Sequence, residues 1–232
     1  MSEEKKKPKS SGGCLSKLMM LFLLVAMAGL CTAVFFVTQP QDLTDLGGYG
    51  PAVRATPVRD MKAVLQNAID RGYAVTLSEA EINQWLGETL AMKQGGFLGE
   101  QFKLEHFWVR LEPGYAELIM ERSLFGKSLT LSMYFKVEKV ESGKEIITTF
   151  NPAGGPFLKD YEFPQKGGRL GQLVVPQGFL YLVMPAFKKV EALFEKETDL
   201  AFKQMHRISF ENDRIVLDPR ETLGGQGMPQ TF

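Results

Sequence analysis

Residues 18–37 form an uninterrupted apolar run, LMMLFLLVAMAGLCTAVFFV, which constrains this chain more than any other feature. A helix of twenty residues rises about 30 Å, which matches the hydrocarbon core of a bilayer. Eleven of the twenty residues are Leu, Phe or Val, and each favours membrane insertion by about 0.3–0.6 kcal/mol near the helix centre. No charged residue opposes insertion. The run is therefore predicted to be a single transmembrane helix.

The charges on either side of this run predict its orientation. Residues 38–53 contain two Asp and no Lys or Arg. Because Lys and Arg are retained on the cytoplasmic side, we expect residues 1–17 to be a cytoplasmic basic tail and the main domain to be extracytoplasmic. The expected location is a bacterial inner (cytoplasmic) membrane, crossed once by a signal anchor, with the domain in the periplasm. The lysines before the run are Lys5, Lys6, Lys7, Lys9 and Lys17.

A cleaved signal peptide is the alternative interpretation of the same region. A basic start, an apolar stretch from Leu18 and a small-residue site at 26–28 satisfy that pattern. Against it, the apolar run continues for nine residues beyond Ala28. A lipoprotein is disfavoured because Leu30 precedes Cys31, where a small residue is expected.

Composition excludes several classes of function. The chain is 44% hydrophobic and formally neutral, so it lacks the basic surplus of a nucleic-acid-binding protein. Residues 1–37 hold five Lys, Glu3 and Glu4, a net charge of +3, so residues 38–232 carry −3. Both cysteines, Cys14 and Cys31, lie in the tail and the span. The outer domain therefore has no disulfide, thiolate metal site or Cys nucleophile.

The rest of the chain divides into a linker, one domain and a tail. Residues 38–55 are rich in Gly, Pro and Asp, which predicts a spacer that lifts the domain off the membrane. Residues 56–219 are long enough for a single extracytoplasmic domain with its own core. Residues 220–232 are predicted to be a flexible, Gly-rich tail.

The first part of this domain is predicted to be helical around a short strand. Thr56-Pro57 has the N-cap and first-turn pattern of an amphipathic helix that ends at Gly72. Residues 73–77 are rich in β-forming residues. Residues 78–81 match a capping box, which predicts a second helix ending near residues 95–96.

From Phe102 the apolar period changes to two, which predicts an antiparallel meander of at least four strands. In the third strand one face is expected to be buried and the other to be solvated or only partly covered. The predicted strands are residues 102–112, 115–122, 128–138 and 145–150, and the inward residues of the third are Leu129, Leu131, Met133, Phe135 and Val137.

The C-terminal part alternates between loop, strand and helix. Residues 151–168 contain three Pro and four Gly, which predicts a long loop or a strand broken by bulges. A strand is expected at 169–175, followed by an amphipathic helix at 176–197 that Pro185 kinks. Residues 207–210 and 214–217 are predicted to pair as a hairpin.

Together these patterns predict an α+β fold, in which an N-terminal transmembrane helix precedes one domain with a curved antiparallel β-sheet packed against two or three helices. The order of features resembles the YpmS-like family of single-pass bacterial extracytoplasmic proteins. It is more distantly similar to envelope phospholipid-binding domains. The resemblance covers about residues 73–218 and implies an apolar groove with no catalytic residues to carry over. The stretches that carry it are YAVTLSEAEINQWL, GKSLTLSMYFKV, GQLVVP and RISFENDRIVLDP.

Catalytic signatures are absent from the sequence. His106 and His206 are the only histidines, which excludes a multi-histidine metal site, and no G-x-S-x-G elbow is present. Glu117 and Glu121 alternate on a predicted strand, which is typical of a solvated face rather than a carboxylate pair for glycoside hydrolysis. Gly167-Gly168 falls short of a dinucleotide fingerprint. We therefore expect no enzyme activity, no cofactor and no metal.

The many aromatic and Met residues of the domain have two interpretations. They are the packed core of a sheet on helices, or they line a partly open apolar cleft between the concave sheet and helix 176–197, gated by the loop 151–168. The second predicts a binding module for a lipid or acyl chain, with membrane lipid as its partner. The alternative is a non-catalytic scaffolding domain that recruits an envelope protein partner; the oligomeric state stays open. The candidate cleft residues are Trp85, Met133, Phe135, Phe179, Val183 and Phe187.

Overall fold

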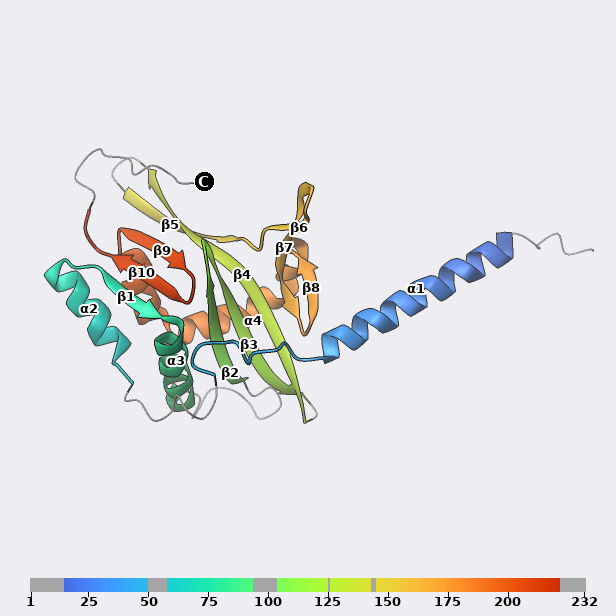
Figure 1. Cartoon of the computed structure of the whole chain (residues 1–232), viewed down its shortest axis with the longest axis horizontal. Helices are drawn as coiled ribbons and strands as arrows, with labels where there is room; N and C mark the ends of the chain where they lie inside the picture. Colours follow the sequence, from blue (N-terminus) through green and yellow to red (C-terminus); the bar gives the residue numbers. More distant parts are fainter. Residues whose placement is uncertain (1–14, 50–57, 94–103, 125, 143–144, 222–232) are drawn as a thin grey trace, which may run out of the picture.

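The structure, a computed structural model, describes residues 15–49, 58–93, 104–124, 126–142 and 145–221. It is an α+β protein with one long apolar helix, a curved open antiparallel sheet and several shorter helices (Figure 1). The predicted fold class is therefore confirmed.

Helix α1 (Leu15–Thr38) projects away from the folded domain (Figure 1). None of its residues is buried, and its mean hydropathy reaches 2.6. Within the described part of the chain it is the one helix long and apolar enough to cross a membrane. The coarse prediction of an N-terminal membrane segment is therefore supported, and a signal sequence near the N-terminus would pass the same test of length and composition.

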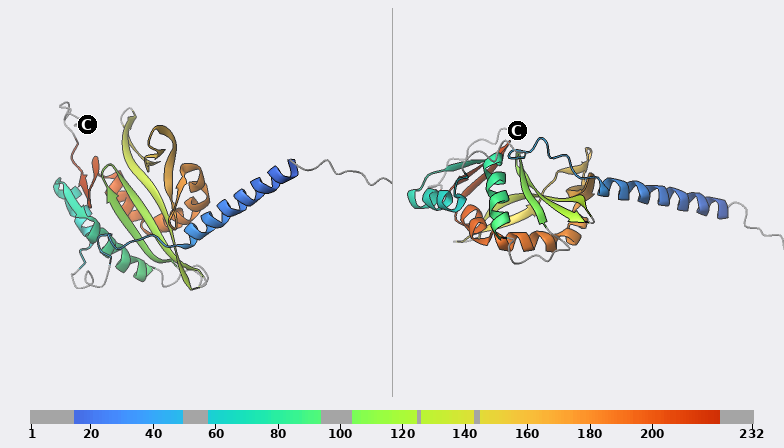
Figure 2. Two further views of the ribbon diagram at one scale, coloured as in Figure 1. Left: turned by 45° about the vertical axis from the view of Figure 1, so that its right-hand side comes forward. Right: turned by 90° about the horizontal axis from the view of Figure 1, so that it is seen from below.

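The large sheet is built around β4, a strand of 16 residues. One edge of β4 pairs with β3, and the other edge pairs first with β7 and then, from Phe135 onward, with β5. This division lets the sheet curve around the helices (Figure 2). The strands are β2 (Leu104–Glu112), β3 (Tyr115–Leu124), β4 (Lys127–Ser142), β5 (Glu145–Pro152), β6 (Pro156–Leu158), β7 (Tyr161–Leu170) and β8 (Leu173–Pro176).

A small second sheet closes one end of the domain. Strand β1 (Val75–Ser78) pairs with β10 (Arg214–Asp218), which pairs with β9 (Arg207–Glu211). The predicted C-terminal hairpin is confirmed. Backbone hydrogen bonds join this sheet to the large one, from Gly114 N to Phe210 O at 3.0 Å and from Asp213 N to Leu111 O at 3.2 Å.

The two helices before the large sheet follow their capping signals. Helix α2 (Met61–Arg71) is capped by Asp60, whose side chain accepts from Ala63 N, and ends at Gly72 in the left-handed conformation. The predicted start at 56–57 lies outside the described residues. Helix α3 (Glu79–Lys93) opens with the predicted capping box, in which Ser78 N donates to Glu81 Oε2 at 2.9 Å. Its predicted end near 95–96 also lies outside the described residues.

The single helix predicted at 176–197 is instead broken into pieces. Phe194 has φ −116° and ψ 21°, which is not helical, so α4 (Leu180–Leu193) stops there. Short pieces flank α4: the 3₁₀ turn η3 (Gln177–Phe179), α5 (Glu195–Thr198) and the π-helical η4 (Asp199–Lys203). Pro185 lies inside α4, and the kink stays a prediction. The buried face of α4 consists of Leu180, Val183, Phe187 and Val190.

Two alternatives were predicted for the Pro/Gly-rich stretch 151–168, and the structure has the irregular strand rather than the long loop. It ends β5 and forms the hairpin of β6 and β7, whose pairing contains a register shift. The prediction of one continuous strand at 169–175 is wrong. Gly171 (φ 57°) turns the chain there, so that the end of β7 and the start of β8 pair with each other.

Residues 39–49, which we call the strap, do not form the predicted spacer. Leu43 and Leu46 are buried against Trp108 and Ile119 in a second small core on the outer face of the large sheet. Gln41 N also donates to the Thr130 hydroxyl at 2.9 Å. The composition of the strap is that of a linker, but two leucines on an otherwise polar segment are enough to fix it to the sheet.

Candidate functional site

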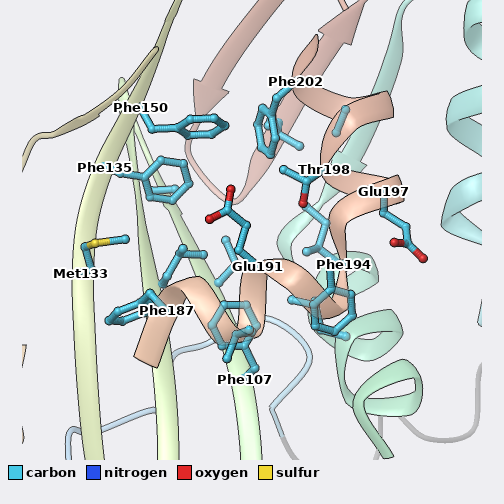
Figure 3. Close-up of a pocket in the computed structure, with 18 of the residues that line it drawn as sticks. Phe107, Met133, Phe135, Phe150, Phe187, Glu191, Phe194, Glu197, Thr198 and Phe202 are labelled. Carbon is cyan, nitrogen blue, oxygen red and sulfur yellow. The ribbon is translucent and has the colours of Figure 1, made fainter. Parts of the chain in front are cut away.

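An apolar cavity of about 340 Å³ lies between the inner face of the large sheet and the helices (Figure 3). Side chains from β2, β3 and β4 form one wall, and α4, α5 and η4 form the opposite wall. Residues of α2, α3 and the small sheet close the remaining sides, among them Met61, Leu65, Trp85, Leu86, Phe210, Ile215 and Leu217.

The strand register explains the shape of the sheet wall. Across the strands, Leu111, Ala116 and Phe135 form one row, because Ala116 pairs with both neighbours. The central residue of this row is small, while both flanking side chains are large. A methyl group between two large side chains leaves a hollow in the wall. Ala116 is therefore the residue that shapes the sheet side of the cavity.

Of the six predicted cleft residues, four line the cavity: Trp85, Met133, Phe135 and Phe187. Val183 is buried in the main core but is not part of the lining. Phe179 is half-exposed, because it lies in the η3 turn before α4 begins and does not share the buried face of that helix.

The predicted cleft residues left out six aromatic side chains that line the cavity: Phe107, Tyr134, Phe150, Phe194, Phe202 and Phe210. Phe150 and Phe202 contact each other edge to face, with ring centroids 5.4 Å apart, across the space between β5 and η4 (Figure 3). Phe150 belongs to an expected strand, but its partner lies on a π-helical segment beyond the predicted end of helix 176–197. Phe202 was missed because the helix was predicted to end at residue 197, before η4 begins.

The helical side of the cavity carries charged groups at its surface. Lys188 and Glu191 are exposed residues on α4 that also contribute to the lining. Figure 3 shows the Glu191 carboxylate directed toward the space between Phe135 and Phe202. An apolar interior with charges of both signs at one side is the arrangement that suits an amphiphile, whose tail is buried and whose head stays near water.

Hydrogen bonds hold η4, which carries Phe202, to strands β4 and β5 of the sheet. The Phe202 carbonyl accepts from the Thr148 hydroxyl at 3.0 Å and from the Lys139 ammonium. The Lys139 ammonium also donates to the Thr148 hydroxyl at 2.7 Å. Burial lowers the pKa of Lys139. The aromatic pair at the opening is therefore positioned by a polar anchor just behind it.

The outer face of the sheet holds a buried ionic network beside the strap. Glu117 is 1% exposed, pairs with Arg110 at 3.0 Å and accepts from the Ser132 hydroxyl. Arg169 Nε lies 3.5 Å from the same carboxylate and donates to the Tyr134 hydroxyl at 2.6 Å. Burial, together with the charge of Glu117, raises the pKa of Tyr134 to about 12. The interpretation of Glu117 as part of a solvated face is therefore wrong, because its carboxylate is buried between the two arginines and Ser132.

A second carboxylate clamps the strap to the edge of the sheet. Glu79 accepts from Gly47 N at 2.6 Å and from Leu111 N at 2.7 Å, and burial raises its pKa. One turn further along α3, Asn83 donates to Gly47 O and Val109 O and accepts from Val109 N. These side chains satisfy the free backbone groups of edge strand β2 and so protect it from pairing with another chain.

The contacts of His106 do not form a Ser-His-Asp triad. His106 Nδ1 lies 3.1 Å from Glu121 Oε2, and the Ser128 hydroxyl donates to the other oxygen of that carboxylate at 2.7 Å. The carboxylate thus lies between histidine and serine, whereas a triad needs the histidine to contact the serine directly. The hydrogen bond to His106 is the main cause of the lowered pKa of Glu121. His206 lies by the small sheet, 3.8 Å from Glu221.

Comparisons with known proteins add no assignment to this geometry. No protein-family model matches the sequence, and no curated protein matches it significantly. In the described part of the chain, no three His, Cys, Asp or Glu side chains are grouped so that they could hold a metal ion. The apolar cavity is the feature of the described residues on which a functional proposal can rest.

Proposed function

We propose that this protein is a membrane-anchored, extracytoplasmic binding module whose cavity holds an apolar ligand, a lipid or an acyl chain. The single observation that carries the proposal is the cavity of about 340 Å³ with its largely apolar lining. This volume lies within the range of about 300–1000 Å³ that is typical of small-molecule sites.

The energetics favour an acyl chain over a polar ligand. Each buried methylene contributes roughly 0.8 kcal/mol, so a chain of about ten methylenes offers roughly 8 kcal/mol before the cost of ordering it. A polar ligand would lose its hydration in the interior and find few hydrogen-bonding partners there. The resemblance to envelope phospholipid-binding domains agrees with the same ligand class.

The alternative, a non-catalytic scaffold, needs no internal space. A scaffold would be served best by a fully packed core, because each cavity lowers the free energy of unfolding. The cavity therefore favours ligand binding as the first hypothesis, and recruitment of an envelope protein partner becomes the hypothesis to test if binding fails.

The test fills the hollow beside Ala116. The full chain, purified in detergent, is titrated with a fluorescent fatty acid, and a diazirine fatty acid is crosslinked and mapped by mass spectrometry. We expect Ala116→Phe to weaken uptake by at least about tenfold, since displacing two methylenes already exceeds ~1.4 kcal/mol. Crosslinks should fall on the cavity segments of β4 and α4.

Thr76→Phe is the matched control, because it adds the same side chain at an exposed position of β1. It keeps α1, so lipid that merely coats the membrane helix is the same in both variants. Equal uptake by the two variants, with both folded by circular dichroism, would contradict the proposal. Crosslinks confined to α1 would contradict it as well.

A further inference from the structure

A group of exposed apolar side chains covers the β6–β7 hairpin and the start of α4. Tyr181 is 83% exposed, and Phe163 and Leu182 are each 74% exposed. Isolated apolar residues are normal on a surface, but a cluster of large ones marks an interaction site. We call this cluster the hairpin patch; its residues are Phe157, Leu158, Tyr161, Phe163, Phe179, Tyr181 and Leu182.

The two parts of the hairpin patch are structural neighbours. Gln177 of η3, directly before α4, donates to the Gln165 side chain of β7 at 2.9 Å. In Figures 1 and 2, strands β6, β7 and β8 lie at the end of the domain nearest to α1. The patch therefore occupies the end of the domain from which the apolar helix emerges.

The last turn of α1 is fixed to this same end. Gln172 N donates to Phe36 O at 3.0 Å, next to the turn between β7 and β8. A Cβ atom on Gly171 would lie 2.5 Å from Gln39 O and 2.6 Å from Phe36 O, so no side chain fits between the turn and the helix end. The position of the domain relative to α1 is thus set by direct backbone contact.

We infer that the hairpin patch is a membrane-contact surface, inserted into the interface of the same bilayer that α1 crosses. The end of α1 sets the membrane surface at the β7–β8 turn, and the patch lies on the strand and helix that adjoin this turn. Phe, Tyr and Leu are the residues that enter the headgroup region. This inference is independent of what the cavity binds.

The charges near the patch specify the kind of lipid surface. The charged residues of the hairpin are Lys159, Asp160, Glu162, Lys166 and Arg169. The first four cancel, and Arg169 lies 3.5 Å from the buried Glu117 carboxylate, which compensates its charge. Anionic lipids attract clusters of Lys and Arg, and the described hairpin offers none. Contact is therefore driven by apolar burial and should be maintained on a zwitterionic bilayer of phosphatidylcholine.

Tryptophan scanning with brominated lipids tests this inference in the full chain. Phe163→Trp and Tyr181→Trp are reconstituted separately in phosphatidylcholine vesicles with or without bromine on the acyl chains. We expect the added indole to lose at least about half of its emission to bromine, because an inserted apolar surface reaches the boundary between headgroups and acyl chains. The native Trp85 and Trp108 give a constant background, which is subtracted using the unmodified chain.

Ile147→Trp is the control, since Ile147 is 47% exposed but lies on β5 close to the β4–β5 turn, at the end away from α1 (Figure 1). Bromine should leave its emission unchanged. Quenching of Phe163→Trp and Tyr181→Trp no stronger than that of the control would overturn the inference. The inference would also be overturned if the two variants were protected from bromine at high protein density and lost this protection on dilution in lipid. That result would show that a second copy of the chain covers the patch.

Discussion

Glu117 is a carboxylate in a buried position of the sheet. Its carboxylate is almost fully buried and contacts Arg110, Arg169 and Ser132. A buried ion pair is expensive to desolvate, so it adds little stability relative to an apolar group of the same size. Removing only one partner is different, because the other charge remains buried without compensation.

We therefore predict that Glu117→Gln lowers the free energy of unfolding by about 3 kcal/mol, the cost of leaving a buried charge unpaired. Urea denaturation of the full chain in detergent measures the change. Glu138→Gln is the matched control, because Glu138 pairs with Lys136 at the surface, where screening makes ion pairs weak. A loss no larger than that of the control would show that water reaches the network around Glu117.

The alternation of apolar residues along the strands predicted the inner face of the sheet. It did not predict that residues of the outer face are also buried. Alternation along β4 correctly placed Met133 and Phe135 on the core side, since successive side chains of a strand point to opposite faces. The same rule leaves open what lies beyond the other face. Thr130, Ser132 and Tyr134 are buried there. Thr130 accepts from Gln41 of the strap, Ser132 donates to Glu117, and Tyr134 accepts from Arg169.

At the scale of elements, the strap shows how a segment with the composition of a linker becomes structural. Its two leucines contribute a small core, and Glu79 and Asn83 hold its backbone to β2. Sequence analysis missed this because the partners of the strap lie 30 to 90 residues away along the chain. No local period reports a contact of that kind.

We predict that Leu46→Ala lowers the free energy of unfolding by about 2–5 kcal/mol, the usual cost of truncating a buried leucine. Thermal unfolding followed by circular dichroism measures the loss. Thr44→Ala, at an exposed position of the same strap, should change little. If both variants melt together, the strap is a spacer after all.

The C-terminal helices show a different limit of sequence reasoning. The helical period persists through Leu193 and Phe194, so one continuous helix was the natural prediction. The break at Phe194 and the π-helical η4 place Phe202 opposite Phe150, at the opening of the cavity. Backbone departures of this type depend on tertiary packing, and π-helical turns occur frequently at functional sites.

At the scale of the whole molecule, the charge asymmetry around the apolar run is the basis for predicting which side of the membrane the domain occupies. We predict that a reporter enzyme active only outside the cytoplasm is active when fused after Phe232, because the five N-terminal lysines all lie before the apolar run 18–37. The chain should also stay with membranes after extraction with alkali. Activity only of a cytoplasmic reporter would contradict the proposed orientation, and release by alkali would favour a cleaved signal peptide.

The backbone contact between Gly171 and the end of α1 also limits how far the protein can reach. A domain on a flexible tether sweeps a hemisphere whose radius grows with the length of the tether, but here the strap and the β7–β8 turn take up the chain that would have formed one. Under the proposed function, a ligand would have to come to within one domain diameter of the bilayer that α1 crosses. Such a protein would act on molecules at the membrane surface, and transfer across the envelope would require a second carrier.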